Sequence, residues 1–167
     1  MFSVLQNIIR FIVLVVVQVL ILNNIQFLGY INPFLYIYFI LALPMRVSRW
    51  LLLFLAFALG LTIDIFSNTM GLHAFATVFV AFLRAPAINI FTSIDQTTDS
   101  ELSVRALGWM AYLRYAGILV LIHNALIFTL EAFSFVNFGI IILKILLSSV
   151  VTILLIVAIQ MFKKDKI

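Results

Sequence analysis

Apolar runs as long as a membrane-spanning helix recur along this chain and constrain its fold more than any other feature. The run from Phe138 to Phe162 contains a single charged residue, Lys144. A helix needs about 20 apolar residues to cross a hydrocarbon core of roughly 30 Å. The 167-residue chain is 66% apolar and 10% charged, so it also lacks the polar surface of a water-soluble domain. The sequence therefore predicts a polytopic membrane protein made of helices.

Six such segments can be threaded through a bilayer, which predicts an all-α bundle of six transmembrane helices forming one domain, 1–167. The expected spans are about 7–23, 27–43, 50–66, 71–90, 107–130 and 138–162. The second span is short, because the run from Pro33 to Leu43 contains only 11 residues. It must begin nearer Phe27 or cross where the membrane is thin. Asn32 and Pro33 are expected as the N-cap and first residue of its helix.

The most polar stretch lies between the fourth and fifth spans. Thr98 to Glu101 has the form of a capping box, in which the threonine and the glutamate each bond a free backbone N–H. We expect a helix to begin there and to lead into the fifth span. Pro86 predicts a kink near the end of the fourth span.

Lys and Arg residues are distributed asymmetrically between the loops. The loops after the second and fourth spans and the C-terminal tail contain Arg46, Arg49, Arg105, Lys163, Lys164 and Lys166. The three opposite loops contain no Lys or Arg. The positive-inside rule therefore predicts that both termini are cytoplasmic. A five-span threading would separate the basic tail from Arg46 and Arg49, which favours a second segment that crosses.

Composition and motifs argue against catalysis. The chain has no Cys and two His, so thiolate chemistry is excluded and a metal site is not expected. It contains no phosphate-binding loop, no zinc-protease or serine-hydrolase motif, and no suitably spaced carboxylate pair. The net charge of +4 is explained by the Lys and Arg residues of the cytoplasmic loops rather than by nucleic-acid binding. No enzyme activity and no cofactor are expected.

Polar residues within the spans form stripes at helical spacing. Ala56, Gly60 and Asp64 recur at i, i+4 and i+8, which puts them on one face that should contact another helix. Further stripes are His73/Thr77/Ala81/Arg84 with Ala85 beside them, Arg114/Gly117/Leu121/Asn124, and Lys144/Ser148/Thr152. Because an ionisable group within a membrane is costly, we expect a polar seam inside the bundle. Its expected members are Asp64, His73, Thr77, Arg84 and Arg114.

Each of these residues also has a simpler interpretation. The Ala56/Gly60 and Ala81/Ala85 pairs can pack helices within the chain or bind another protein. Arg84 and Arg114 can extend to cytoplasmic headgroups. Lys144 can reach the outer surface or pair with Glu131. His73 and His123 can be interfacial or hydrogen-bonded histidines, and Asp64 can remain hydrated at its helix end.

The turn between the third and fourth spans carries a recognisable pattern. Gly60 and Asp64 stand four residues apart, and Gly71 and Ala74 follow after six intervening residues. This G-x-x-x-D…G-x-x-A pattern, with the chain length, six apolar segments and short basic C-terminus, resembles the MreD family of bacterial rod-shape-determining membrane proteins. Gly60 permits close helix approach, Asp64 can accept bonds from the start of the next helix, and Gly71 allows the turn.

The resemblance implies an inner-membrane scaffold of the cell-elongation machinery, with no catalysis of its own. Such a protein associates with the bitopic protein MreC and works beside the filament protein MreB, a SEDS-type glycan polymerase and a penicillin-binding transpeptidase. It helps to control peptidoglycan synthesis. The family's fold is similar to that of the S components of energy-coupling-factor transporters.

That similarity supplies an alternative function, the substrate-binding S component of a vitamin or small-molecule transporter. S components typically dock through an A-x-x-x-A motif in the first helix, and Asn7 to Leu22 contains no alanine. A handler of lipid-linked precursors or an ion channel would predict pore-lining charges that repeat symmetrically or broken helices in matched halves, and the sequence shows neither. For the scaffold, Ala81 and Ala85 are the favoured partner interface and Ala56 a further candidate.

Overall fold

The computed structural model describes residues 4–25, 31–92, 101–133 and 137–162, and every named element within them is a helix. The helices are α1 (Val4–Leu20), η1 (Leu22–Asn24), η2 (Leu35–Ile37), α2 (Tyr38–Ala42), α3 (Arg49–Ser67), α4 (Leu72–Phe91), α5 (Val104–Leu107), α6 (Trp109–Ala132) and α7 (Phe138–Phe162). Residues 31–34, directly before η2, have an irregular backbone.

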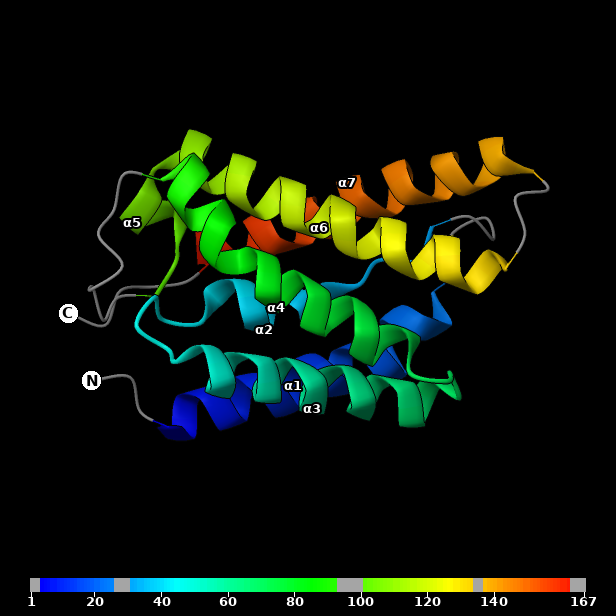
Figure 1. The fold of residues 1–167 in the computed structure, drawn as a ribbon, viewed down its shortest axis with the longest axis horizontal. Coiled ribbons are helices and arrows are strands. Elements are labelled where there is room, and N and C mark those ends of the chain that lie inside the picture. Colours follow the sequence, from blue (N-terminus) through cyan, green and yellow to red (C-terminus); the bar gives the residue numbers. More distant parts are fainter. Residues whose placement is uncertain (1–3, 26–30, 93–100, 134–136, 163–167) are drawn as a thin grey trace.

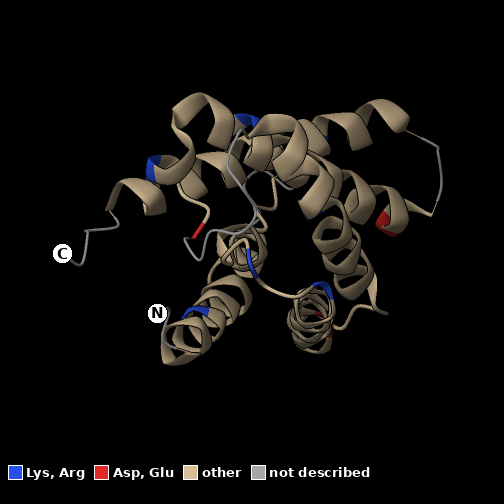
Figure 2. Cartoon of the chain, turned by 60° about the vertical axis from the view of Figure 1, so that its left-hand side comes forward, with Lys and Arg blue, Asp and Glu red and all other residues tan. Residues whose placement is uncertain are grey.

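Five segments are long and apolar enough to cross a membrane: α1 with η1, α3, α4, α6 and α7. They lie where the first, third, fourth, fifth and sixth spans were expected. Their outer faces expose large apolar side chains such as Trp50, Phe82 and Leu154. Charged residues are sparse over the whole ribbon in Figure 2. An apolar exterior of this kind suits contact with lipid and indicates a membrane protein.

The long helices pack in chain order, with α3 on α4, α4 on α6 and α6 on α7, while α1 packs against α3. Figure 1 shows them as roughly aligned rods, with α1 and α3 on one side and α6 and α7 on the other. The short helices η2 and α2 contact α1, and between them they also reach α3, α4 and α7. The residues from 33 to 43 are all buried, so this segment is the centre of the bundle.

The central segment differs from the expected second span. Asn32 and Pro33 do not begin a helix: the backbone is irregular there, the 3-10 turn η2 begins at Leu35, and regular α-helix is limited to the five residues of α2. The helix does end before Pro44, as expected. Side chains of other helices supply hydrogen bonds that would otherwise come from an α-helix, which is why an irregular backbone is stable here.

The central segment nevertheless runs the length of the bundle. In Figure 1 it starts at the right-hand end, where α1 finishes, and returns to the left-hand end, where α3 begins. Among the described residues, five passes along the bundle axis are the long helices, and the central segment with η2 and α2 makes one more. The described ends, Val4 of α1 and Phe162 of α7, lie at the same end of the bundle.

The entry to α6 also differs from the expectation. Glu101 does not cap a helix: it forms an ion pair with Arg10 of α1, and its backbone bridges to Pro44. Ser103 instead caps the short helix α5, its hydroxyl accepting a hydrogen bond from the Ala106 N–H at 3.2 Å. Gly108, with φ of 78°, then separates α5 from α6. Residues 98–100 of the expected capping box lie outside the described residues.

Candidate functional site

Four of the five expected seam residues lie in the interior. Asp64, His73, Thr77 and Arg84 are each at most 6% exposed. The expectation is wrong for Arg114, which is exposed on α6 and lies outside the seam. Helical spacing placed Arg114 on the face of Asn124, but the packing of α6 turns that end of the face outward.

The α3–α4 turn is built around the Asp64 carboxylate. Its Oδ1 accepts hydrogen bonds from the Thr69 hydroxyl at 2.5 Å and the His73 N–H at 3.0 Å, and its Oδ2 accepts one from the Ala74 N–H at 2.8 Å. The carboxylate thus satisfies free N–H groups at the start of α4 and lies at the positive end of that helix. Gly71 adopts φ of +84°, as the turn requires.

Gly60 allows α3 and α4 to approach closely one turn below Asp64. A Cβ atom at this position would lie 2.4 Å from the Ala74 Cα and 2.6 Å from the His73 carbonyl oxygen. No side chain fits there. Gly60, Asp64, Gly71 and Ala74, which carry the sequence pattern, therefore form one compact helix-turn-helix contact.

His73 continues this cluster into the centre of the bundle. Its Nδ1 lies 2.9 Å from the Tyr36 hydroxyl, which lies 2.9 Å from the Nε2 of His123. His123 Nδ1 faces Asn124 Oδ1 at 3.4 Å, and the Asn124 amide donates to the Ser149 hydroxyl at 2.9 Å. This chain of hydrogen bonds joins the central segment to α4, α6 and α7. Tyr36 was not singled out in the sequence because no helical stripe contains it.

Arg84 secures the other end of the central segment. Its guanidinium donates to the Leu43 and Pro44 carbonyl oxygens and, at 3.3 Å, to the Tyr115 hydroxyl. The Tyr115 hydroxyl in turn donates to the Leu41 carbonyl at 3.2 Å. Leu41 lies in the last turn of α2, Leu43 is the C-cap of that helix, and Pro44 follows it, so these carbonyls lie at or beyond the helix end, where intrahelical partners run out. Arg84 therefore caps a buried helix end and does not extend to headgroups.

The beginning of the central segment is held by polar side chains of α1 and α7. Gln18 donates to the Pro33 carbonyl at 3.0 Å and accepts from the Leu35 N–H at 2.8 Å. The Asn32 N–H donates to the Ser148 hydroxyl and the Phe34 N–H to the Thr152 hydroxyl. Ser148 and Thr152 of the Lys144/Ser148/Thr152 stripe thus face the interior, whereas Lys144 is partly exposed.

Two buried glutamines, Gln18 and Gln160, have structural roles that the sequence analysis did not predict. Gln160 donates hydrogen bonds to the hydroxyls of Tyr38 and Tyr112. A polar amide within an apolar run was the sequence signal that could have identified both. Lys144 is partly exposed, and within the described residues it forms no ion pair with Glu131.

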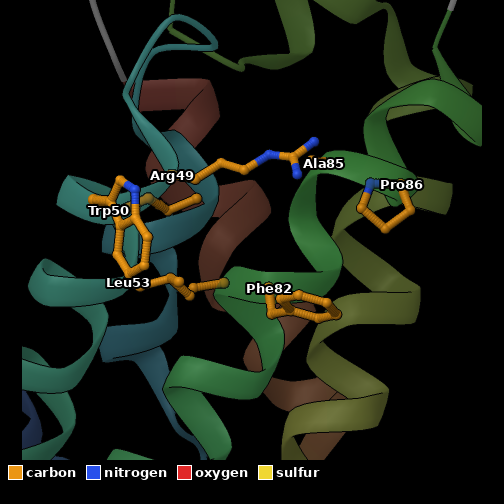
Figure 3. A pocket seen from close by; sticks show the side chains of 8 residues that line it. Arg49, Trp50, Leu53, Phe82, Ala85 and Pro86 are labelled. Atoms are coloured by element: carbon orange, nitrogen blue, oxygen red, sulfur yellow. The ribbon is translucent and has the colours of Figure 1, made fainter.

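A groove of about 420 Å³ lies between the first half of α3 and the second half of α4. Ala81 and Ala85 belong to it, with walls formed by Trp50, Leu53 and Phe82 (Figure 3). Its lining is completed by Arg49, Leu52 and Pro86. Ala56, the other interface candidate, is fully buried, and Ala81 is itself only 2% exposed. Of the three candidates, Ala85 is therefore the one that the groove leaves partly exposed.

A second cavity, of about 280 Å³, lies at the opposite end of the bundle. It is bounded by the ends of α1, α3 and α6, the start of α4 and the start of the central segment. Its lining is mainly polar: Asn23, Asn24, Asn32, Ser67, Thr69, His73 and Glu131 join Val19, Phe34, Phe66, Leu72 and Ile127. The described residues contain no group of three or more His, Asp or Glu that could hold a metal ion.

Comparisons of the chain with protein-family models, with curated proteins and with solved structures gave no match. The function is therefore inferred from the groove, the buried polar side chains and the sequence resemblance.

Proposed function

We propose that the chain is a non-catalytic scaffold of the bacterial cell-elongation machinery, similar to MreD, in the inner membrane with both termini cytoplasmic. It binds an MreC-like bitopic protein and helps to control peptidoglycan synthesis beside a SEDS-type polymerase and a penicillin-binding transpeptidase. The residues that carry the resemblance support this proposal, since Gly60, Asp64 and Gly71 have the structural roles that the pattern implied.

The groove over Ala81 and Ala85 carries the proposal. Transmembrane helices associate by close packing at small residues, and here the half-buried Ala85 lines a groove whose walls include the bulky side chains of Trp50 and Phe82. Ala81, one turn earlier on α4, is buried at the base of the α3–α4 contact and adds no bulk there. A single helix with its own small-residue face fits such a groove. In Figure 3 the Arg49 side chain extends from α3 towards Ala85, which places a positive charge at one end.

The buried polar side chains support a structural role. Asp64 and Arg84 of the seam, with Gln18 and Thr152, each bond backbone groups of the α3–α4 turn or the central segment. These side chains stabilise an irregular backbone within the bundle. A rigid bundle with an external groove suits a protein that acts by binding other membrane proteins.

Ala85→Leu, which would fill the groove from a half-buried position, provides the test. In a rod-shaped bacterium depleted of its own MreD, the wild-type chain co-expressed with its MreC-like partner should restore rod shape and co-purify with that partner. Ala85→Leu should do neither, although the variant protein should remain monodisperse. Ala158→Leu on α7 is the matched control, because Ala158 is also half-buried but lies outside the groove.

The outcomes separate the candidate functions. Loss of co-purification in Ala85→Leu alone would support the scaffold and this interface. Retained binding in both variants would move the interface to the Phe-rich outer faces. Failure of the wild-type chain to bind an MreC-like protein, together with co-purification of an ATPase pair, would favour the S-component alternative.

A further inference from the structure

The groove beside Ala85 has a positive charge at its mouth. Arg49, which lines the groove, is exposed, and within the described part of the chain its guanidinium forms no ion pair or hydrogen bond. Arg46, three residues earlier in the chain, is exposed as well. None of the described residues that line the groove is Asp or Glu. An anionic group at the mouth would therefore meet a cation, with no carboxylate in the described lining to repel it.

The depth of this charge in the membrane follows from the helices that frame the groove. Arg49 is the first residue of α3, which is long and apolar enough to span a membrane, so its side chain lies at the edge of the hydrocarbon layer. Trp50 beside it is 85% exposed, and exposed indoles favour the same interfacial depth. Further into the layer, Leu53 and Phe82 form the walls of the groove (Figure 3). The groove is thus cationic at headgroup depth and apolar at acyl-chain depth.

This distribution of charge and apolar surface suits an anionic phospholipid. Its phosphate lies at the depth of Arg49, and an acyl chain can lie over Ala85 and along Phe82. A partner helix does not explain the charge, because the cytoplasmic ends of transmembrane helices carry an excess of Lys and Arg, which Arg49 would repel. Basic pockets between helices on the cytoplasmic side recognise anionic headgroups, and the end of α3 that carries Arg49 is proposed to be cytoplasmic.

From these observations we propose that the groove binds an anionic phospholipid when no partner helix occupies it. The Arg49 guanidinium pairs with the phosphate, and one acyl chain lies over Ala85 between Leu53 and Phe82. A partner helix that packs on Ala85 needs the same space, so it displaces this lipid when it binds. The lipid site stands independently of the scaffold function, whereas the competition rests on it.

Quenching of Trp50 fluorescence in the purified full-length chain measures occupancy of the groove. The chain contains two Trp residues, so Trp109→Phe leaves Trp50 as the only indole. In neutral detergent micelles, phosphatidylglycerol with brominated acyl chains should quench it saturably, at a mole fraction about fivefold lower than brominated phosphatidylcholine. Equal quenching by the two lipids would overturn the proposal. Displacement of the brominated lipid by inorganic phosphate would overturn it too, because binding would then need no acyl chain.

Variants identify the groups responsible. Arg49→Gln should remove the preference for phosphatidylglycerol and Arg49→Lys should keep it, because only the first removes the charge. Ala85→Leu should weaken quenching by both lipids, since leucine fills the groove. Arg114→Gln is the matched control, because Arg114 is also exposed, near the start of α6, but lies outside the groove. A preference that survives Arg49→Gln, or that Arg114→Gln removes equally, would refute this site.

A last measurement separates the lipid site from the scaffold function. Addition of the full-length MreC-like partner, with its own Trp residues replaced by Phe, should relieve the quenching of Trp50 by brominated phosphatidylglycerol. Unchanged quenching while the partner is bound would overturn the competition. A chain that binds the partner but shows no lipid preference would overturn the lipid site and leave the scaffold intact. A chain that shows the preference but binds no MreC-like protein would do the reverse.

Discussion

Individual residues decide how closely α3 and α4 approach. The backbone of α4 occupies the position that a Cβ of residue 60 would take, whereas a Cβ at Gly117 on α6 would meet only Ile153 Cδ1 at 3.9 Å. A side chain therefore has no space at Gly60 but does have space at Gly117, so the same substitution at the two positions tests the close contact.

Gly60→Ala should therefore destabilise the protein, because the 2.4 Å contact with Ala74 Cα forces the two helices apart. The expected loss is about 1–3 kcal/mol of unfolding free energy, typical of overpacking. Gly117→Ala should be neutral or stabilise by up to about 1 kcal/mol, because alanine is the better helix former. Reversible unfolding in mixed detergent micelles measures both values. Equal stability of the two variants would contradict the close contact.

Loss of the Asp64 side chain should weaken the link between α3 and the start of α4. Asp64→Ala leaves the N–H groups of His73 and Ala74 without their acceptor, so the unfolding free energy should fall by about 1–3 kcal/mol without preventing folding. Asp64→Asn keeps one acceptor oxygen and should lose less. Glu131→Gln, at an exposed carboxylate, should have no effect on stability. An Asp64→Ala variant as stable as Glu131→Gln would show that the turn does not depend on this carboxylate.

Residues with local roles were predictable from the sequence. Asp64 bonds residues nine and ten positions later, across one turn, and the glycine spacing shows that turn directly. The role of Arg84 was not predictable in the same way, because its partners at Leu43 and Pro44 are about 40 positions earlier. Arg114 was misassigned because helical periodicity gives a face but not the neighbour that covers it.

At the scale of elements, the long helices and the central segment have different physical origins. Helices α3, α4, α6 and α7 satisfy their own backbone groups, so apolar length was enough to locate them. The central segment depends on Gln18, Ser148 and Thr152, which lie up to 118 positions away in sequence. The predicted helix start at Pro33 was wrong because it took only neighbouring residues into account. No local sequence pattern shows that these three distant side chains lie beside the central segment.

Gln18→Leu should loosen the central segment selectively. Its amide bonds the Pro33 carbonyl and the Leu35 N–H, and leucine satisfies neither group. We expect faster hydrogen exchange across residues 35–42 than in α3, and a loss of about 1–3 kcal/mol in unfolding free energy. Gln160→Leu is the control: its amide bonds only tyrosine hydroxyls, so backbone exchange in η2 should change less. Uniform acceleration over the whole chain would indicate general destabilisation instead.

On the scale of the whole molecule, the path of the central segment determines which helix ends lie together at one end of the bundle. The central segment returns the chain to the end where α1 began, so α3 starts at that end, and α4 and α7 finish there. The central segment is short for a membrane crossing, but its polar groups are satisfied by neighbours, so the bundle can carry it through the bilayer without a long helix.

This arrangement makes the membrane topology testable. Reporter fusions at the C-terminus and within residues 93–100 should both report cytoplasm, as the loop distribution of Arg46, Arg49 and Arg105 requires. A fusion after Phe133, at the other end of the bundle, should report the periplasm. If residues 31–43 returned to the side from which they entered, α3 and every later element would be inverted. The 93–100 and C-terminal fusions would then become periplasmic together, against the positive-inside rule.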